Sequence, residues 1–462
     1  MDPCKSGPKQ GTHLGALFAY VPCGTDQDGI LLHPEAPRWA VANQSSLKIV
    51  ECLAAPGGST DSAADFLVEE YGLTLAAARQ DVDHVMDHLA RHGLSSDSLM
   101  EEPRPRIGSL MLVLTERCNL ACTHCYGAFP ACKELPLPRV LRLIDELVEG
   151  GGRTLTLSGG EPLLYRGLKD VVARVGKRIR VQFCTNGTLI DAQWARLFSQ
   201  QLDPYFQISL DGPTAATHDA IRGPRAFEGA LRGIRQLQEA GLGDRIILAT
   251  TIQRTNKNVL LEILHLAAKL GVKTLRFLPL RKEGRAQETW ACTGESLDVP
   301  AYEAIFDRFL TNHTDLPKGV ELSCGLNGFT LNQSPEGNGG DLVCSVGSTM
   351  FVEASGEAFP CAVLNRKECL LGSVLESSLH DLVHGEAMAK LHAIKTRRKL
   401  EIPRCAPCIW KNFCQAGCMA MAVNETGTFW DVDEFCSYRQ RAYPRAFNDI
   451  LAISAPPSDP TS

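Results

Sequence analysis

The segment "SLMLVLTERCNLACTHCYG" (109–127) joins a strand pattern to a cysteine motif, and the interpretation of the whole chain starts from it. Its first seven residues are mostly apolar, which predicts a buried β-strand over 109–115. Cys118, Cys122 and Cys125 follow with C-x3-C-x2-C spacing. Three thiolates so close together can hold three corners of a cubic iron–sulfur cluster and leave one iron open to a substrate or cofactor.

A zinc site is the competing interpretation of these cysteines. It would need a fourth side chain, and the nearby candidates are His124 and Cys132. The chain has 18 cysteines, and its first residues, "MDPCKSGPKQ", lack the apolar core of a signal peptide, which predicts a cytoplasmic protein with reduced thiols. Thiols at this density in a reducing compartment favour metal binding over disulfides.

The composition limits the classes of partner. The 462 residues are 44% hydrophobic and 22% charged, which predicts two or three globular domains. The net charge of −6 gives no general attraction to nucleic acid or to acidic membrane surfaces. No run of about 18 apolar residues is present, so we expect no membrane-spanning segment.

Short apolar runs alternate with helical patterns from residue 107 to about 315. Six runs have the length and composition of strands: 109–115, 153–164, 180–190, 205–212, 245–252 and 274–280. This alternation predicts an α/β domain in which a parallel sheet, covered by helices, curls into a partial (β/α)6 TIM barrel. In such folds the functional residues lie at the carboxyl ends of the strands, which is where the three cysteines fall.

The cysteine motif and the segment "SGGEPLL" (158–164) together resemble the radical S-adenosylmethionine (SAM) superfamily. The resemblance implies that a 4Fe–4S cluster on Cys118, Cys122 and Cys125 binds SAM. Its reduced form would supply one electron and yield a 5′-deoxyadenosyl radical. The resemblance also implies that the GGE element receives the SAM amino group, because glycines allow close backbone approach and a carboxylate can pair with an ammonium. That element consists of Gly159, Gly160 and Glu161.

Further SAM contacts are implied by the same resemblance. Ser209 and Asp211 end the fourth predicted strand in "ISLDG", and Arg222 follows in "HDAIRG". Related enzymes use a similar arrangement for the ribose and carboxylate of SAM. Asn186, after the third strand, is a weaker candidate for the same pocket. No catalytic general base can be named, and Cys132 and Cys292 are further candidates for an active-site thiol.

A second cysteine pattern occupies residues 316–450 and resembles the SPASM domain of radical SAM enzymes. The resemblance implies two auxiliary 4Fe–4S clusters, hence three clusters in all. The ligands implied for the first auxiliary cluster are Cys344, Cys361 and Cys418. The ligands implied for the second are Cys405, Cys408, Cys414 and Cys436. Cys324 is preferred as the fourth ligand of the first cluster, and Cys369 is its rival.

The first 96 residues form a separate module in this interpretation. Strand patterns over 16–23, 29–34 and 38–43 precede helical patterns near 45–54, 60–71 and 75–92, which suggests a winged-helix fold. Residues 1–100 carry 6 Lys and Arg against 13 Asp and Glu, a balance of −7 that disfavours duplex DNA. A linker over 97–107 and a disordered tail over 451–462 complete the expected organisation.

This module resembles the RiPP recognition element, a PqqD-like domain that binds the leader of a ribosomally made precursor peptide. The resemblance implies that the leader adds as a strand beside 39–43, against the 75–92 helix. The leading hypothesis is therefore a peptide maturase that forms a thioether or carbon–carbon crosslink, or epimerises a residue. Ferredoxin or flavodoxin would be the reductant.

Two alternatives stay open at this point. One is a SPASM enzyme that acts on a tetrapyrrole or matures a metal-cofactor enzyme; the other is a non-catalytic iron–sulfur redox or regulatory protein. The GGE and ISLDG elements disfavour the latter, since an electron carrier needs no SAM pocket. Sulfatase maturation is also disfavoured, because Ala362 stands where those maturases have an Asp after the cysteine. The substrate and the oligomeric state remain open.

Overall fold

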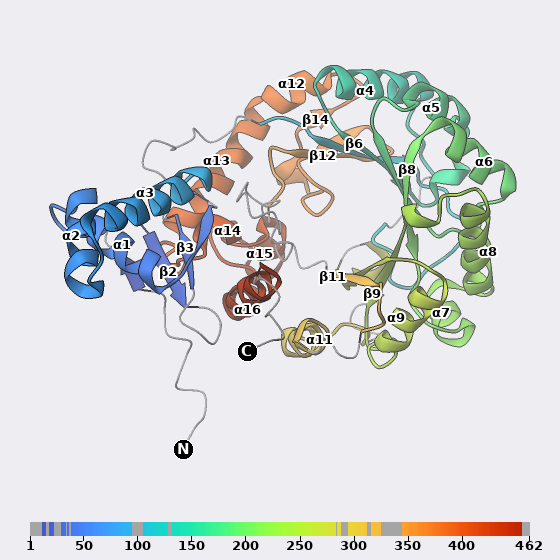
Figure 1. Cartoon of the computed structure of the whole chain (residues 1–462). Helices are drawn as coiled ribbons and strands as arrows, with labels where there is room; N and C mark the ends of the chain where they lie inside the picture. Colours follow the sequence, from blue (N-terminus) through green and yellow to red (C-terminus); the bar gives the residue numbers. More distant parts are fainter. Residues whose placement is uncertain are drawn as a thin grey trace. The chain divides into compact units, whose positions relative to one another are not determined.

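The computed structural model describes residues 12–14, 18–22, 29–33, 35–36, 38–94, 105–127, 132–282, 284–287, 294–311, 316–324 and 344–454. The chain divides into two compact units (Figure 1). The first comprises Met1–Pro103, Asn327–Cys344 and Lys395–Ser462. The second comprises Arg104–Leu326 and Ser345–Ile394.

An antiparallel sheet and three helices begin the first unit. The sheet has the order β1 (Thr12–Leu14), β2 (Phe18–Pro22), β3 (Gly29–Leu32), β4 (Trp39–Ala42). The helices that follow are α1 (Gln44–Ala54), α2 (Thr60–Tyr71) and α3 (Leu75–Arg91), and their N-termini are capped by Asn43, Ser59 and Thr74. The predicted strands and helices are present here, with β1 as an additional short strand. β4 lies at an edge of the described sheet.

The two faces of this sheet pack against different parts of the first unit. Leu31, Ala40 and Ala42 face the core formed with α1, α2 and α3. The other face includes Trp39, which packs edge-on against Phe447 of α16 (Cys436–Ser454) with 5.2 Å between ring centroids. The amino-terminal sheet therefore shares a hydrophobic core with the carboxyl-terminal helix.

In the described residues of the second unit, ten strands form one curved sheet. Its central six are parallel and follow chain order: β5 (Ser109–Thr115), β6 (Thr154–Gly159), β7 (Arg180–Thr185), β8 (Asp203–Ser209), β9 (Ile246–Ile252) and β10 (Thr274–Pro279). Figure 1 shows the helices outside this curve: α4 (Leu137–Glu149), α5 (Leu168–Val175), α6 (Ala192–Gln201), α7 (Ala215–Arg222), α8 (Ala226–Glu239) and α9 (Leu260–Lys269). The expected six-stranded partial barrel is confirmed.

The sheet continues beyond these six strands at both edges. β11 (Glu321–Cys324) pairs in parallel with β10, and β12 (Thr349–Val352) pairs in parallel with β5. β13 (Glu357–Phe359) and β14 (Gly372–Ser373) then extend the sheet in antiparallel pairings. The added strands have only two to four residues, too few for a periodic pattern to be recognised.

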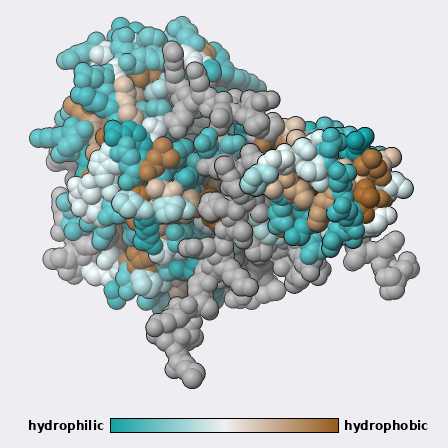
Figure 2. All heavy atoms as spheres, turned by 90° about the vertical axis from the view of Figure 1, so that its left-hand side faces the viewer, coloured by the Kyte–Doolittle hydropathy of each residue, from teal (hydrophilic) through white to brown (hydrophobic). Residues whose placement is uncertain are grey.

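Further helices in the described residues include α11 (Val299–Thr311), α12 (Leu379–His384), α13 (Glu386–Glu401), α14 (Lys411–Cys414) and α15 (Met419–Thr426). α16 runs to Ser454, so the first four residues of the expected disordered tail are helical; its remainder, like most of the expected linker, lies outside the described residues. No helix in the described part of the chain is long and apolar enough to cross a membrane. The face seen in Figure 2 is mainly hydrophilic, with smaller apolar patches.

Side chains of the central strands alternate between two environments. On β8, Phe206 and Ile208 are fully buried, whereas Gln207 and Ser209 line a cavity inside the curve of the sheet. A strand presents successive side chains to opposite faces, so the apolar set packs under the helices and the polar set faces inward. This alternation produces a polar interior in which a functional site can form.

Candidate functional site

A cavity of about 830 Å³ lies within the barrel unit. Its lining includes most of the barrel residues that the sequence singled out: Cys118, Cys122, Cys125, Gly159, Gly160, Asn186, Ser209 and Arg222. Glu161 and Asp211 are fully buried and lie outside the lining. The fold thus gathers residues from four strand ends around one space, as expected for a parallel barrel.

The two glycines at the end of β6 allow the chain to pass close to residues 115–127, which contain Cys118, Cys122 and Cys125 and are called the cysteine segment below. Gly160 N–H donates to the carbonyl of Thr115 at 2.8 Å. A Cβ on Gly159, whose φ is 151°, would lie 2.4 Å from that same oxygen. A Cβ on Gly160 would lie 2.5 Å from the carbonyl oxygen of Arg117. Only glycine fits at these positions, because backbone atoms cannot yield as flexible side chains can.

Glu161 joins the end of β6 to the end of β7. Its Oε1 accepts hydrogen bonds from the Thr185 hydroxyl at 2.8 Å and the Leu163 N–H at 3.2 Å. Its Oε2 accepts from the Asn186 N–H at 2.9 Å. Burial raises the pKa of Glu161 to about 7. The side chain therefore has a structural role here, and its expected contact with the SAM amino group stays a prediction.

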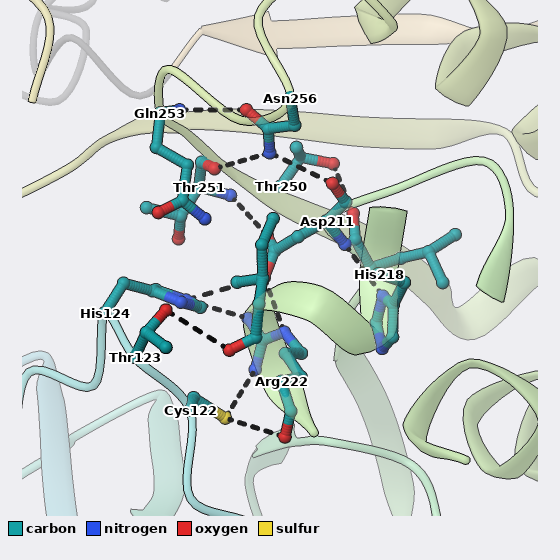
Figure 3. Close-up of polar contacts among 12 residues, drawn as sticks. Cys122, Thr123, His124, Asp211, His218, Arg222, Thr250, Thr251, Gln253 and Asn256 are labelled. Carbon is teal, nitrogen blue, oxygen red and sulfur yellow. Dashed lines mark hydrogen bonds and ion pairs between the residues drawn. The ribbon is translucent and has the colours of Figure 1, made fainter. Parts of the chain in front are cut away.

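Asp211 and Arg222 form a buried ion pair, with 2.5 Å between Asp211 Oδ2 and Arg222 Nε (Figure 3). Asp211 Oδ1 also accepts the Thr251 N–H at 2.8 Å. Burial opposes ionisation, but the Arg222 guanidinium holds the pKa of Asp211 below its ordinary value. His218 Nδ1 accepts the Asp211 N–H at 3.1 Å, and burial lowers the pKa of His218 to about 4.

The same ion pair is connected to the cysteine segment. His124 Nε2 lies 3.5 Å from Asp211 Oδ2 and 3.3 Å from Arg222 Nη2. The Thr123 N–H donates to the Ile221 carbonyl at 3.0 Å. Asp211 and Arg222 thus position the segment between Cys122 and Cys125, a role that the sequence did not predict. His124, a candidate zinc ligand in the sequence, lies in this network.

Several cavity residues were not predicted from the sequence. The Tyr126 hydroxyl lies 3.3 Å from Ser158 Oγ. Arg276 comes from the middle of β10, and Arg285 Nη1 donates to the carbonyl of Cys122 at 2.8 Å. A charged residue inside the apolar run "TLRFLPL" was the available signal for Arg276, because buried strands seldom carry unpaired charge.

Four cysteines of the first unit surround a second, small cavity. They are the residues expected to bind the second auxiliary cluster: Cys405, Cys408, Cys414 and Cys436. Arg404, Lys411 and Arg439 contribute cations to the same lining. Arg439 pairs with buried Asp433, and its Nε lies 3.2 Å from Cys414 Sγ. Burial raises the pKa of Cys405 to about 12, so a thiolate there needs nearby positive charge such as iron or these side chains.

The cysteines expected at the first auxiliary cluster belong to both units. Cys344 and Cys418 are buried in the first unit, and Cys361 follows β13 in the second. The assignment of these three stays a prediction. Of the candidates for the fourth ligand, Cys369 is fully buried, which raises its pKa to about 11. Cys324 ends β11 opposite Phe277.

The remaining thiol candidates differ in position. Cys132 is exposed, has a positive φ of 49° and lines the barrel cavity, whereas Cys292 lies outside the described residues. Within the described ranges, no three His, Cys, Asp or Glu side chains converge to hold one shared metal ion. A cubic cluster has a different requirement, because each thiolate binds a separate iron.

Comparison with known proteins identifies the family. The pattern of the Radical SAM superfamily matches residues 112–267, and that of the SPASM iron–sulfur cluster-binding domain matches 344–409. Mycofactocin maturase MftC of Mycobacterium ulcerans is 30% identical over 321 residues, which cover 66% of this chain and 81% of the relative. The chain belongs to the radical SAM superfamily. It is therefore an enzyme, and its two matched domains indicate SAM and iron–sulfur clusters as cofactors.

Other known proteins are similar to further parts of this radical SAM enzyme or to most of its chain. Residues 28–94 match coenzyme PQQ synthesis protein D (PqqD). An AdoMet-dependent heme synthase of Nitratidesulfovibrio vulgaris is 26% identical over 374 residues, covering 77% of this chain and 98% of the relative. Streptococcus suis SuiB bound to precursor peptide SuiA has a similar fold, with a TM-score of 0.57 and 13% identity over 92% of this chain and 99% of SuiB.

The described residues fit the cofactors of the radical SAM superfamily. Three thiols and two glycines line one side of a cavity large enough for a SAM-sized ligand. Cys122 is buried, and burial raises the pKa of its thiol, so bound iron would help to hold it as a thiolate. Ala362 lines the same cavity, so that position supplies no carboxylate.

Proposed function

We propose that this enzyme is a radical SAM/SPASM maturase that modifies a ribosomally synthesised peptide, by forming a thioether or carbon–carbon crosslink or by epimerising a residue. The observation that carries the proposal is the PqqD-like module with an open edge strand, in one chain with the SAM barrel. A module that binds a leader would deliver the rest of the precursor to the barrel. The chain's −7 balance over residues 1–100 makes nucleic acid a poor alternative ligand.

The proposed docking site is the edge of β4 that pairs with no other strand among the described residues. The Val41 carbonyl accepts a hydrogen bond from His88 Nε2 of α3 at 3.1 Å, so this carbonyl faces α3 and away from β3. In an antiparallel strand the N–H of a residue points to the same side as its C=O. Val41 therefore offers one donor and one acceptor to an added strand, which is how edge strands bind peptides.

His88 would be displaced from Val41 when a leader strand adds at this edge. The imidazole occupies the acceptor that the leader N–H would need. Removing the imidazole therefore favours leader binding, whereas removing the Val41 N–H disfavours it. The Trp39 face of the same sheet packs against α16, so leader binding must be measured on the full chain.

The barrel residues would hold and orient the cofactor and substrate. Cys118, Cys122 and Cys125 would hold a 4Fe–4S cluster, which with SAM supplies a radical that abstracts a hydrogen atom from the substrate. The Asp211 and Arg222 pair keeps the cysteine segment in place beside the cavity. We place the reaction in the cytoplasm, with ferredoxin or flavodoxin as electron donor, because the thiols must stay reduced.

Leader binding to the full-length enzyme tests this proposal. The ligand is a labelled leader peptide taken from a small open reading frame next to the gene, where one is found, and fluorescence anisotropy measures its affinity. We expect Val41→Pro to weaken binding about tenfold, as loss of an edge hydrogen bond predicts, and His88→Ala to strengthen it. His84→Ala is the matched control, because His84 is exposed one turn earlier on α3. Unchanged affinity in both test variants would contradict docking at β4.

A second candidate function is supported by one comparison. The similarity to the heme synthase of N. vulgaris covers nearly all of that relative, so a tetrapyrrole is the alternative substrate. An enzyme for a tetrapyrrole needs no peptide edge on its amino-terminal sheet. Conversion of a haem precursor by a variant that has lost leader binding would favour this alternative over the peptide.

A further inference from the structure

The barrel cavity carries an excess of positive charge. Its described lining contains five arginines: Arg117, Arg222, Arg276, Arg281 and Arg285. Glu116 is the single carboxylate among the described lining residues. An excess of this size in a concave, partly enclosed site favours an anionic ligand, because charges removed from water need a counter-charge.

Three of the five arginines already have structural partners. Arg117 pairs with Glu134 at 2.6 Å, and Arg222 pairs with Asp211. Arg285 donates to the backbone carbonyl of Cys122. These contacts hold the cysteine segment and the loops around it. The two carboxylates supply the counter-charges of Arg117 and Arg222, and the hydrogen bond to Cys122 fixes the position of Arg285.

Among the described residues, Arg276 and Arg281 have no such contact with the cysteine segment or the loops around it. Arg276 Nη1 donates to the amide oxygen of Gln207 at 3.0 Å, so its side chain reaches from β10 over β9 to β8 along the inner face of the sheet. That contact is neutral, and no carboxylate pairs with Arg276 among the described residues. Arg281, two residues after β10, has neither an ion pair nor a hydrogen bond to any described residue. Both are partly buried cations whose counter-ion is not supplied by the described chain.

SAM does not neutralise this pair. SAM brings two cationic groups and one carboxylate and hence no net negative charge, while the negative charge of the three thiolates would be shared with the iron of the cluster that they hold. A guanidinium matches a carboxylate with two parallel hydrogen bonds, which lysine cannot do. We propose that Arg276 and Arg281 bind a carboxylate of the substrate segment that enters the barrel, so that the modified part of the peptide is acidic. This inference rests on the proposed peptide-modifying function.

Binding of leaderless peptide probes to the full-length, cluster-containing enzyme with SAM tests the inference. One pair of probes is acetyl-Gly-Gly-Glu-Gly-Gly-amide and its Gln counterpart; the other is acetyl-tetraglycine as the free acid and as the amide. The first pair detects a side-chain carboxylate and the second a C-terminal one. We expect one acid probe to bind about tenfold more tightly than its neutral counterpart, the range of a hydrogen bond to a charged group.

Variants identify the arginines responsible. Arg276→Gln and Arg281→Gln should each reduce the preference for the acid to less than about threefold, and Arg276→Lys should retain part of it because it keeps the charge. Arg232→Gln is the matched control, since Arg232 is an exposed helix residue paired with Glu228 outside the cavity. Circular dichroism of each variant reports whether it is folded, and the Lys variant provides the test if the Gln variants are not.

Three results would overturn the inference. Equal binding of acid and amide in both pairs would show that the cavity does not select a carboxylate. A preference for the acid that survives in Arg276→Gln and Arg281→Gln would show that the carboxylate binds at other residues. A tenfold loss of SAM affinity in these variants, with the probe preference kept, would assign the arginines to the SAM carboxylate. The probes carry no leader, so a failure of docking at β4 leaves their binding unchanged and is measured separately.

Discussion

At the scale of single residues, the Asp211 and Arg222 pair has more structural importance than its place in the sequence suggests. Asp211 is fully buried, so removing the guanidinium would leave a carboxylate without a counter-charge. We expect Arg222→Gln to lower the free energy of unfolding of the barrel unit by about 3–5 kcal/mol. The measurement is urea unfolding followed by circular dichroism.

Arg232→Gln serves as the control for this prediction too. Its partner Glu228 is one turn away on α8 and both side chains are more than half exposed. Screening by solvent limits such a pair to about 1 kcal/mol or less. If the two variants lost equal stability, the buried pair would not be what fixes the cysteine segment.

At the scale of elements, the packing of the amino-terminal sheet on α16 is the main feature that the sequence did not predict. Trp39 is 4% exposed and belongs to one cluster with Trp410, Tyr443 and Phe447, against which Cys408 and Cys414 also pack. We expect Trp39→Ala to lower the free energy of unfolding by about 3–5 kcal/mol, because it leaves a cavity in this cluster. The cavity should also loosen the segment that carries Cys408 and Cys414, so we expect the first unit to bind less iron. Thermal unfolding and iron analysis measure both effects.

Trp430→Ala is the matched control for the Trp39 prediction. Trp430 is 38% exposed and contacts Arg397 with 5.3 Å from the guanidinium carbon to the ring centroid. An exposed cation–π contact contributes about 0.5–1 kcal/mol. Full iron content in folded Trp39→Ala would argue against coupling between the sheet and the segment that carries Cys408 and Cys414.

The difference between predicted and observed features follows from the range of the interactions. Strands such as 109–115 and 274–280 were predicted correctly, because each carries its own apolar pattern over six or seven residues. β11 and β12 are defined by pairing with β10 and β5, which no local pattern encodes. Likewise the cysteine spacing singled out three residues that line one cavity, whereas the contact between His124 and Asp211 joins residues that only the fold brings together.

At the scale of the whole molecule, the distribution of cysteines predicts separable iron sites. The barrel cysteines line one cavity, and four cysteines of the first unit line another. Anaerobically reconstituted enzyme should hold roughly 12 Fe, and replacing Cys118, Cys122 and Cys125 with Ala should leave roughly 8. The same variant should lose dithionite-driven formation of 5′-deoxyadenosine. A content of only about 4 Fe in the wild-type enzyme, by contrast, would contradict the prediction of two auxiliary clusters.

The central claim is that the enzyme modifies a peptide, and mass spectrometry of the neighbouring precursor tests it most directly. The full-length enzyme, SAM and dithionite are incubated with the precursor in deuterated buffer. We expect 5′-deoxyadenosine to form together with a changed peptide, in which a crosslink removes two hydrogens and an epimerisation replaces one carbon-bound hydrogen by deuterium. An unchanged precursor, in a reaction that forms 5′-deoxyadenosine and converts a haem precursor instead, would contradict the claim.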